Sequence, residues 1–274
     1  MLAFHNDQHI KDFYVARVLA HQQADEIVQG QYWHHGKGCA VGCTLHATGG
    51  DHARYETELG IPRQIAHFQD RLFEALPNGE AKTFPLAFLT AIPVGAELSL
   101  VMPRLMVWLL ADAEAGVLRF VKSEQSKAAN AAVVKLYTRL IAGESVETED
   151  WQAARVGAYA AYSAYAGGAA YAAYAAAAVY AAYAAAAYAA DAAAAAYDAA
   201  AYAAYAAAAY AAYAAAAAYD AAAYAADAAA AYAADAAYAY AADAAAREAH
   251  FLEIRDKLLD LLASAPVPVN QEAS

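Results

Sequence analysis

Residues 159–246 constrain the chain most strongly, because three residue types fill almost all of this stretch. It holds 60 Ala, 18 Tyr and 6 Asp, and the other four positions are Ser163, Gly167, Gly168 and Val179. The pattern recurs after 22 residues, or two elevens, and successive units begin at Tyr180, Tyr202 and Tyr224. A fixed period of this kind indicates a repeat architecture.

The repeat is predicted to be helical, because Ala has the best helix propensity and no residue between Gly168 and Arg247 stops a helix. Eleven residues make three turns, so positions eleven apart share one stripe. Two architectures fit this pattern. One is a continuous helix of roughly 117 Å, at about 1.5 Å per residue. The other is a bundle or solenoid that folds back every 22 residues, with Asp198 and Asp220 as N-caps.

The surface of the repeat points to packing or to periodic binding. Its recurring Asp residues argue against a membrane segment, since a charge inside a bilayer costs a few kcal/mol. The 11-residue spacing is similar to that of the Ala-rich fish antifreeze helices, although Tyr and Asp replace their Thr. We therefore expect a protein partner or self-association through the repeat, with an ice-binding or other periodic-surface binder as an alternative.

Composition changes near residue 158 and divides the chain into three predicted parts. An N-terminal helical globular domain is expected over residues 1–158, the helical repeat over 159–246, and an amphipathic C-terminal helix with a tail over 247–274. The predicted fold class is all-α. A small strand pair around 117–122 is the alternative to a purely helical first part.

Apolar spacing, caps and breakers predict the individual helices. The helix over 7–29 is expected to be capped by Asn6 or Asp7 and ended by Gly30. Asn78 and Gly79 are expected to form a turn. Pro103 is expected either to kink a buried helix over 96–111 or to open its second half. The predicted segments are 7–29, 39–48, one capped by Asp51, 61–77, 85–92, 96–111, 126–142, one that opens at Thr148, and a terminal helix over 247–263.

Charge and cysteine usage exclude some classes of function. The net charge is −12, and half of it comes from the six Asp of the repeat, which contains no basic residue. We see no basic patch, which argues against nucleic-acid binding through phosphates. The N-terminus does not read as a signal peptide, and two Cys four residues apart form no disulfide framework. We therefore expect a cytoplasmic protein without a membrane or nucleic-acid partner.

Chemistry concentrates in the segment HHGKGCAVGCTLH, residues 34–46, followed by His52. Cys39 is placed where a helix is expected to begin, and the positive end of the helix dipole together with Lys37 favours its thiolate. A cysteine-dependent enzyme would use Cys39 as nucleophile, with His34, His35, His46 or His52 as the base.

Two other interpretations of the same segment remain open. Cys39, Cys43 and His46 share one helical stripe, and His52 can complete a zinc site of four ligands. Alternatively, Cys39 and Cys43 are core residues, since free Cys behaves as a small buried hydrophobe. In that case Gly38 and Gly42 permit a close approach of another helix.

GKGCAVGCTLH, the following ELGIP and the Ala-rich tail together resemble uncharacterised bacterial and phage proteins. The resemblance covers most of residues 1–150 and the composition of the tail, and it implies a bacterial or phage origin but no activity. The leading hypothesis is a structural or protein-interaction protein whose repeat serves as a helical arm. A cysteine-dependent enzyme at Cys39 is the alternative.

Overall fold

A computed structural model describes residues 1–46, 51–121, 123–164 and 244–268 of the chain. Most of these residues are helical, and the sheet among them is a two-stranded antiparallel hairpin. The predicted all-α class is therefore confirmed. The predictions for the 22-residue repeat, including the caps at Asp198 and Asp220, lie outside the described residues.

The chain divides into two compact units. Unit 1 joins residues 1–105 with 241–274, and unit 2 comprises residues 106–240. The division falls inside helix α6 (Val101–Ala111), whereas the composition changes only near residue 158. The C-terminal helix, which the sequence sets apart, thus belongs to the same unit as the N-terminus.

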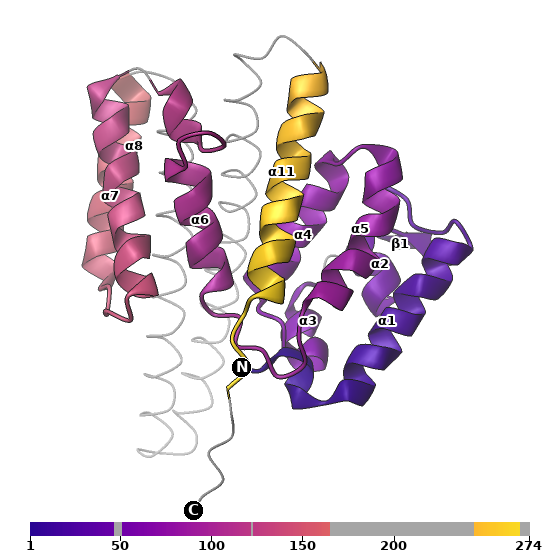
Figure 1. The fold of residues 1–274 in the computed structure, drawn as a ribbon. Coiled ribbons are helices and arrows are strands. Elements are labelled where there is room, and N and C mark those ends of the chain that lie inside the picture. The colour runs from indigo at the N-terminus through magenta and orange to yellow at the C-terminus, as the bar shows by residue number, and fades with distance from the viewer. Residues whose placement is uncertain (47–50, 122, 165–243, 269–274) are drawn as a thin grey trace, which may run out of the picture. The chain divides into compact units, whose positions relative to one another are not determined.

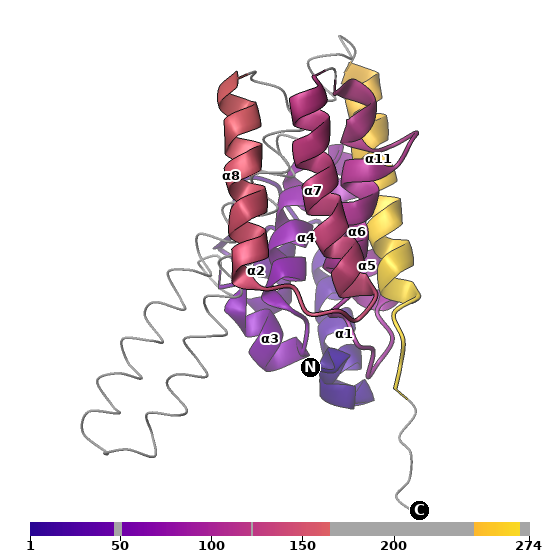
Figure 2. The same cartoon turned by 90° about the vertical axis from the view of Figure 1, so that its left-hand side faces the viewer.

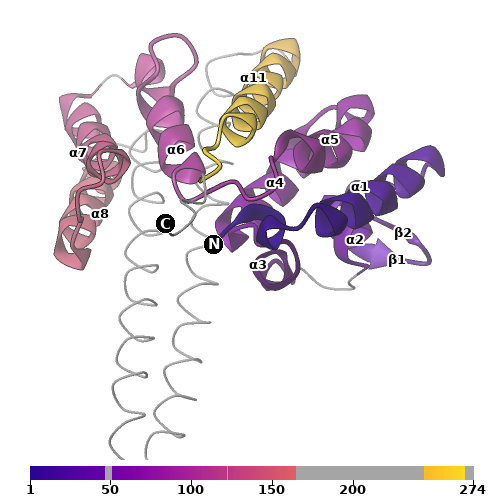
Figure 3. The same cartoon turned by 60° about the horizontal axis from the view of Figure 1, so that its bottom comes forward.

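Unit 1 is built from helices that contact one another in sequence-distant pairs (Figure 1). Helix α1 packs on α5, and α5 also contacts α4 and α11. The short hairpin lies beside α2 (Figure 3). The elements are α1 (Gln8–Gln23), β1 (Trp33–His34), β2 (Lys37–Gly38), α2 (Ala40–Leu45), α3 (Ala53–Leu59), α4 (Arg63–Ala75), α5 (Asn78–Ala91) and α11 (Ala244–Ala263), preceded by a 3-10 turn (Ala3–Asn6).

Helix α1 begins as predicted but ends earlier. The Asp7 carboxylate accepts the His9 N–H at 2.8 Å, which confirms it as the N-cap. The helix stops at Gln23, because Asp25 adopts a φ of 54° and the next N–H bonds back to the His21 carbonyl at 2.9 Å. The predicted end at Gly30 is therefore wrong: a non-glycine residue makes the left-handed turn.

Helix α4 follows its sequence pattern closely. Pro62 stands at its N-cap, and its apolar residues Ile65, Phe68, Leu72 and Phe73 are buried, as predicted. The preceding helix α3 starts one residue later than expected, with His52 instead of Asp51 at its N-cap. It ends at Gly60, whose φ of 63° is the left-handed conformation that favours glycine.

The prediction for the next helix is wrong. Asn78 and Gly79 form no turn, because α5 begins there and carries Pro85, the expected start of a short helix, in its interior while burying Phe84 and Phe88. Packing of these rings outweighs the hydrogen bond that Pro85 removes.

The second of the two expectations for Pro103 agrees with the structure. Helix α6 starts at Val101, within the predicted segment 96–111, and Pro103 lies in its first turn, where an N–H has no helical partner.

Helix α11 completes unit 1, and its predicted apolar stripe is confirmed. Phe251, Ile254, Leu258 and Leu262 are buried. Beyond the helix, the Pro266 carbonyl accepts the Glu97 N–H at 2.8 Å. No helix in the described part of the chain is long and apolar enough to cross a membrane.

Unit 2 contains a helix pair, α7 (Glu124–Ile141) and α8 (Thr148–Ala164), that runs side by side (Figure 2). The Ser123 hydroxyl caps α7 by accepting the Ser126 N–H at 3.0 Å. Trp151 is fully buried, and its ring meets Tyr137 edge-on at 5.1 Å between centroids. The strand pair considered around 117–122 is absent from the described residues there, which form a 3-10 turn at Val117–Phe120.

Candidate functional site

Cys39 is positioned by a close contact between the hairpin and α2. A Cβ atom at Gly42 would lie 1.5 Å from the Tyr32 carbonyl oxygen, and one at Gly38 would lie 2.1 Å from it. Only glycine fits at either position. The Cys39 N–H bonds to the Gln31 carbonyl at 2.7 Å, and Cys39 becomes the N-cap of α2, so the predicted helix start is confirmed.

The surroundings of Cys39 do not favour its thiolate, although its place at the start of α2 is the one predicted. Its side chain is buried and faces the carboxylate of Asp70. Burial, and next the negative charge of Asp70, raise the pKa of the thiol far above its usual value. Lys37 lies exposed on β2, and the backbone N–H groups of the six-residue helix α2 do not offset the burial. This environment disfavours the thiolate that a cysteine nucleophile requires, and the role of Cys39 as a nucleophile stays a prediction.

Two carboxylates of α4 approach Cys39, and sequence reasoning missed both. Asp70 and Glu74 are one helical turn apart, and their oxygens and the Cys39 sulfur all lie within 4.8 Å of one another. One oxygen of Glu74 accepts the Gly30 N–H at 2.8 Å. Among the described residues, Cys39, Asp70 and Glu74 are the group whose ligand atoms lie close enough together to hold a metal ion.

Two histidines stand next to the cluster. The His52 Nε2 lies 3.1 Å from Asp70 Oδ2, so the imidazole holds this carboxylate in place. The His67 ring stacks on His52 with 3.7 Å between centroids. Burial, and next the neighbouring His52, lower the pKa of His67 to about 3, which keeps His67 neutral.

A buried oxygen of the cluster has no hydrogen-bond partner among the described residues. The Tyr55 hydroxyl is fully buried and interacts with Thr44 and Gln69, and burial raises its pKa. Asp70 Oδ1 is enclosed and has no hydrogen-bond partner in the described part of the protein. Such orphaned groups are rare in folded proteins.

Cys43, His46 and His52 do not join Cys39 in a group of potential metal ligands, so the predicted zinc quartet of Cys39, Cys43, His46 and His52 is not assembled among the described residues. The Cys43 thiol donates to the Gly38 carbonyl at 3.2 Å, and burial raises its pKa to about 12. His46 instead lies 2.7 Å from the ring nitrogen of His21. The helical stripe fails because α2 ends at Leu45, before His46.

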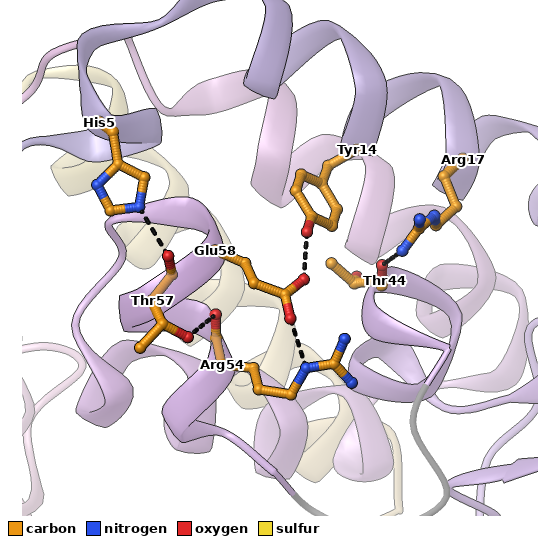
Figure 4. Close-up of polar contacts among 7 residues, drawn as sticks. All are labelled: His5, Tyr14, Arg17, Thr44, Arg54, Thr57 and Glu58. Carbon is orange, nitrogen blue, oxygen red and sulfur yellow. Dashed lines mark hydrogen bonds and ion pairs between the residues drawn. The ribbon is translucent and has the colours of Figure 1, made fainter.

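A polar network joins α1 to α2 and α3 (Figure 4). The Tyr14 hydroxyl and the Arg54 guanidinium both donate to the Glu58 carboxylate, and Arg17 donates to the Thr44 carbonyl at 2.9 Å. Burial alone would raise the pKa of Glu58, but these two donors outweigh it and lower the pKa. Every group here has a partner within the protein, so we interpret the network as structural.

A second candidate site is the groove between α7 and α8 in unit 2. Its volume is about 510 Å³, and small side chains form most of its wall. Lys135, Arg139 and Asp150 are its charged residues. The exposed small residues along it are Ala128, Ala132, Ala153, Gly157 and Ala160.

The chain matches no family model, no curated protein and no solved structure. The chemistry of the Cys39 cluster and of the α7–α8 groove is therefore the basis for inferring function.

Proposed function

We propose that the chain is a structural or interaction protein, and that the groove between α7 and α8 receives residues 165–243 of the Ala/Tyr repeat. The single observation that carries this proposal is the run of exposed alanines and one glycine along the groove. Exposed apolar surface that is contiguous marks an interaction site.

The size of these side chains favours a helix with an equally thin surface. Helix axes approach to about 8–10 Å, and the side chains at the contact set the distance. Alanine on both sides allows the closest approach and the largest number of backbone contacts. The repeat offers such a surface, because 60 of the residues in 159–246 are Ala.

Charge and connectivity support the same occupant. The repeat carries Asp and no basic residue, while Lys135 and Arg139 border the groove. Arg139 is already bonded to Asp150 at 3.0 Å and Glu144 at 3.1 Å, so Lys135 supplies the complementary charge. The repeat also follows α8 directly in the chain, which gives it a high effective concentration near the groove.

Limited digestion of the full chain with chymotrypsin tests the proposal, since the repeat is rich in Tyr and contains no Lys or Arg. Ala132→Glu places a larger, negative side chain in the groove. Ala131→Glu is its matched control, because Ala131 is exposed on the same helix but does not line the groove. We expect faster cleavage within the repeat for Ala132→Glu, and cleavage like the parent for Ala131→Glu.

Equal cleavage rates in the parent and both variants would overturn the proposal. If Ala132→Glu does speed cleavage, sedimentation velocity at several protein concentrations shows whether the repeat in the groove belongs to the same chain or to a second copy. A monomer at all concentrations places the repeat of the same chain in the groove. A concentration-dependent dimer that Ala132→Glu abolishes places there the repeat of a second copy.

A further inference from the structure

We propose that Cys39, Asp70 and Glu74 form a binding site for a divalent transition-metal ion of the zinc class, with one coordination position left open. The site lies in unit 1 and is independent of the proposed docking of the repeat in unit 2. It differs from the cysteine and histidine quartet that the sequence suggests, because two of its three ligands are carboxylates of α4.

The geometry fits such an ion after small side-chain movements. In a tetrahedral zinc site with thiolate and carboxylate ligands, the ligand atoms are roughly 3.5 Å apart. The sulfur of Cys39 and one oxygen from each carboxylate already lie within 4.8 Å of one another. Glu74 is exposed and can rotate inward, whereas the buried Cys39 is fixed by the backbone of the hairpin.

A second, independent observation points to a ligand at this place. Asp70 Oδ1, an atom of the cluster itself, is enclosed and lacks a hydrogen-bond partner among the described residues. An ion bound to this oxygen would satisfy it. Buried polar atoms without a partner are rare in folded proteins, so a bound ion accounts for this one.

The surroundings also hold the carboxylates in the manner of a metal site. His52 contacts Oδ2 of Asp70, and the Gly30 N–H donates to Oε2 of Glu74. Each carboxylate therefore keeps its other oxygen for an ion. Partners of this kind orient metal ligands and raise affinity.

The Cys39 thiol determines which metal ions the site prefers. Carboxylates alone suit Mg²⁺ and Ca²⁺, whereas a cysteine sulfur favours zinc and its neighbours. Binding forms a sulfur–metal bond and breaks the S–H bond, and the proton passes to solvent. No oxidation or reduction is involved.

Titration of the full chain with Co²⁺ tests this site, because cobalt replaces zinc and its bond to a thiolate produces a charge-transfer absorption. We expect this absorption in the parent at one equivalent of cobalt, and its loss on addition of Zn²⁺. Cys39→Ala should abolish it. Cys43→Ala is the matched control, since Cys43 is also buried but donates to the Gly38 carbonyl, and it should keep the absorption.

A second variant leaves the core intact. Glu74→Gln, at an exposed position of α4, should weaken cobalt binding at least tenfold. Glu80→Gln removes the same charge from exposed α5 and should bind like the parent. If Cys39→Ala does not fold, Glu74→Gln decides alone: unchanged affinity would overturn the proposal.

Two further results would contradict it. Cobalt binding without thiolate absorption would assign the ion to surface histidines such as His34 and His35. Absorption that survives in Cys39→Ala but disappears in Cys43→Ala would assign it to the other cysteine.

Discussion

The helices of unit 1 and the α7–α8 pair of unit 2 are held together by different kinds of side chain. Helix α4 buries four large apolar residues and a polar one, Gln69, in a continuous interior. The α7–α8 pair carries many alanines and relies on a few larger contacts, above all that between Tyr137 and Trp151. Since buried area sets most of the stabilisation, unit 1 distributes it over many residues and α7–α8 concentrates it in few.

Replacing the ring at the centre of α8 should have the largest effect. We expect Trp151→Ala to lower the free energy of unfolding by about 3–5 kcal/mol, because the ring is fully buried in α8 and contacts Tyr137 of α7. Val156→Ala, in the same helix but 68% exposed, should change it by about 0.5 kcal/mol at most. Denaturant unfolding of both variants measures the difference. Equal losses in the free energy of unfolding would show that the alanine contacts, and not the Trp151 ring, stabilise the helix pair.

Gly60 in unit 1 and Gly143 in unit 2 allow the packing of the two units to be compared directly. Gly60 and Gly143 both have positive φ, of 63° and 80°, but a Cβ at Gly60 would lie 2.2 Å from the Leu2 carbonyl oxygen, while none meets an atom within 4 Å at Gly143. Gly143→Ala should cost about 1–2 kcal/mol, the strain of a left-handed residue. Gly60→Ala should cost more, because the backbone must also move.

Thermal melting of these two variants checks the ranking. A smaller loss of stability for Gly60→Ala than for Gly143→Ala would mean that the interior of unit 1 yields easily, against the tight packing described above.

The hydrogen bonds to Glu58 allow the contribution of polar contacts to the stability of unit 1 to be measured. The pKa of Glu58 is lowered in the folded chain, so its contribution to stability is complete above its unfolded pKa of about 4.3 and is lost as pH falls through the folded value. Tyr14→Phe should therefore cost about 1–2 kcal/mol at pH 7, and much less at a pH where Glu58 is protonated. Urea unfolding at pH 7 and at a series of acidic pH values below about 4.3 compares the two, and a cost that does not change with pH would refute the role of the carboxylate.

The smallest effect is expected at the surface of unit 2. Lys127 donates to Glu124 at 2.7 Å on an exposed face of α7. Such pairs contribute little, so Lys127→Ala should change the free energy of unfolding by about 0.5 kcal/mol or less. A larger loss would mean that surface charge, not the buried ring, stabilises this helix pair.

Local rules predict the helices of this chain where the signal and the packing agree. The Asp7 cap and the apolar stripe of α4 are confirmed, because a carboxylate at a helix start and a period of 3.6 residues have one stable arrangement. Asn78 and Gly79 mislead, because the burial of distant rings decides where α5 begins.

The candidate site is harder to predict for the same reason. Cys39 is recognisable from its glycines, but Asp70 and Glu74 belong to another helix, and only tertiary structure brings them together. One signal was present in the sequence: Gln69 and Asp70 interrupt the apolar positions of α4, and a polar residue at an inward position is a sign of function. Docking of the repeat stays a prediction, as does ice binding.

Unit 1 is built from two separate stretches of the chain, residues 1–105 and 241–274. Glu97 bonds both to the segment near the N-terminus, through a bridge with Leu2, and to Pro266 near the other end. Residues 106–240 therefore form an insertion between two halves of one folded body. Closing a chain segment costs only about 0.6 kcal/mol more for each doubling of its length. We therefore expect unit 1 to keep its fold when whole 22-residue units of the sequence repeat are added or removed, so that the length of the insertion and the Cys39 cluster can change separately.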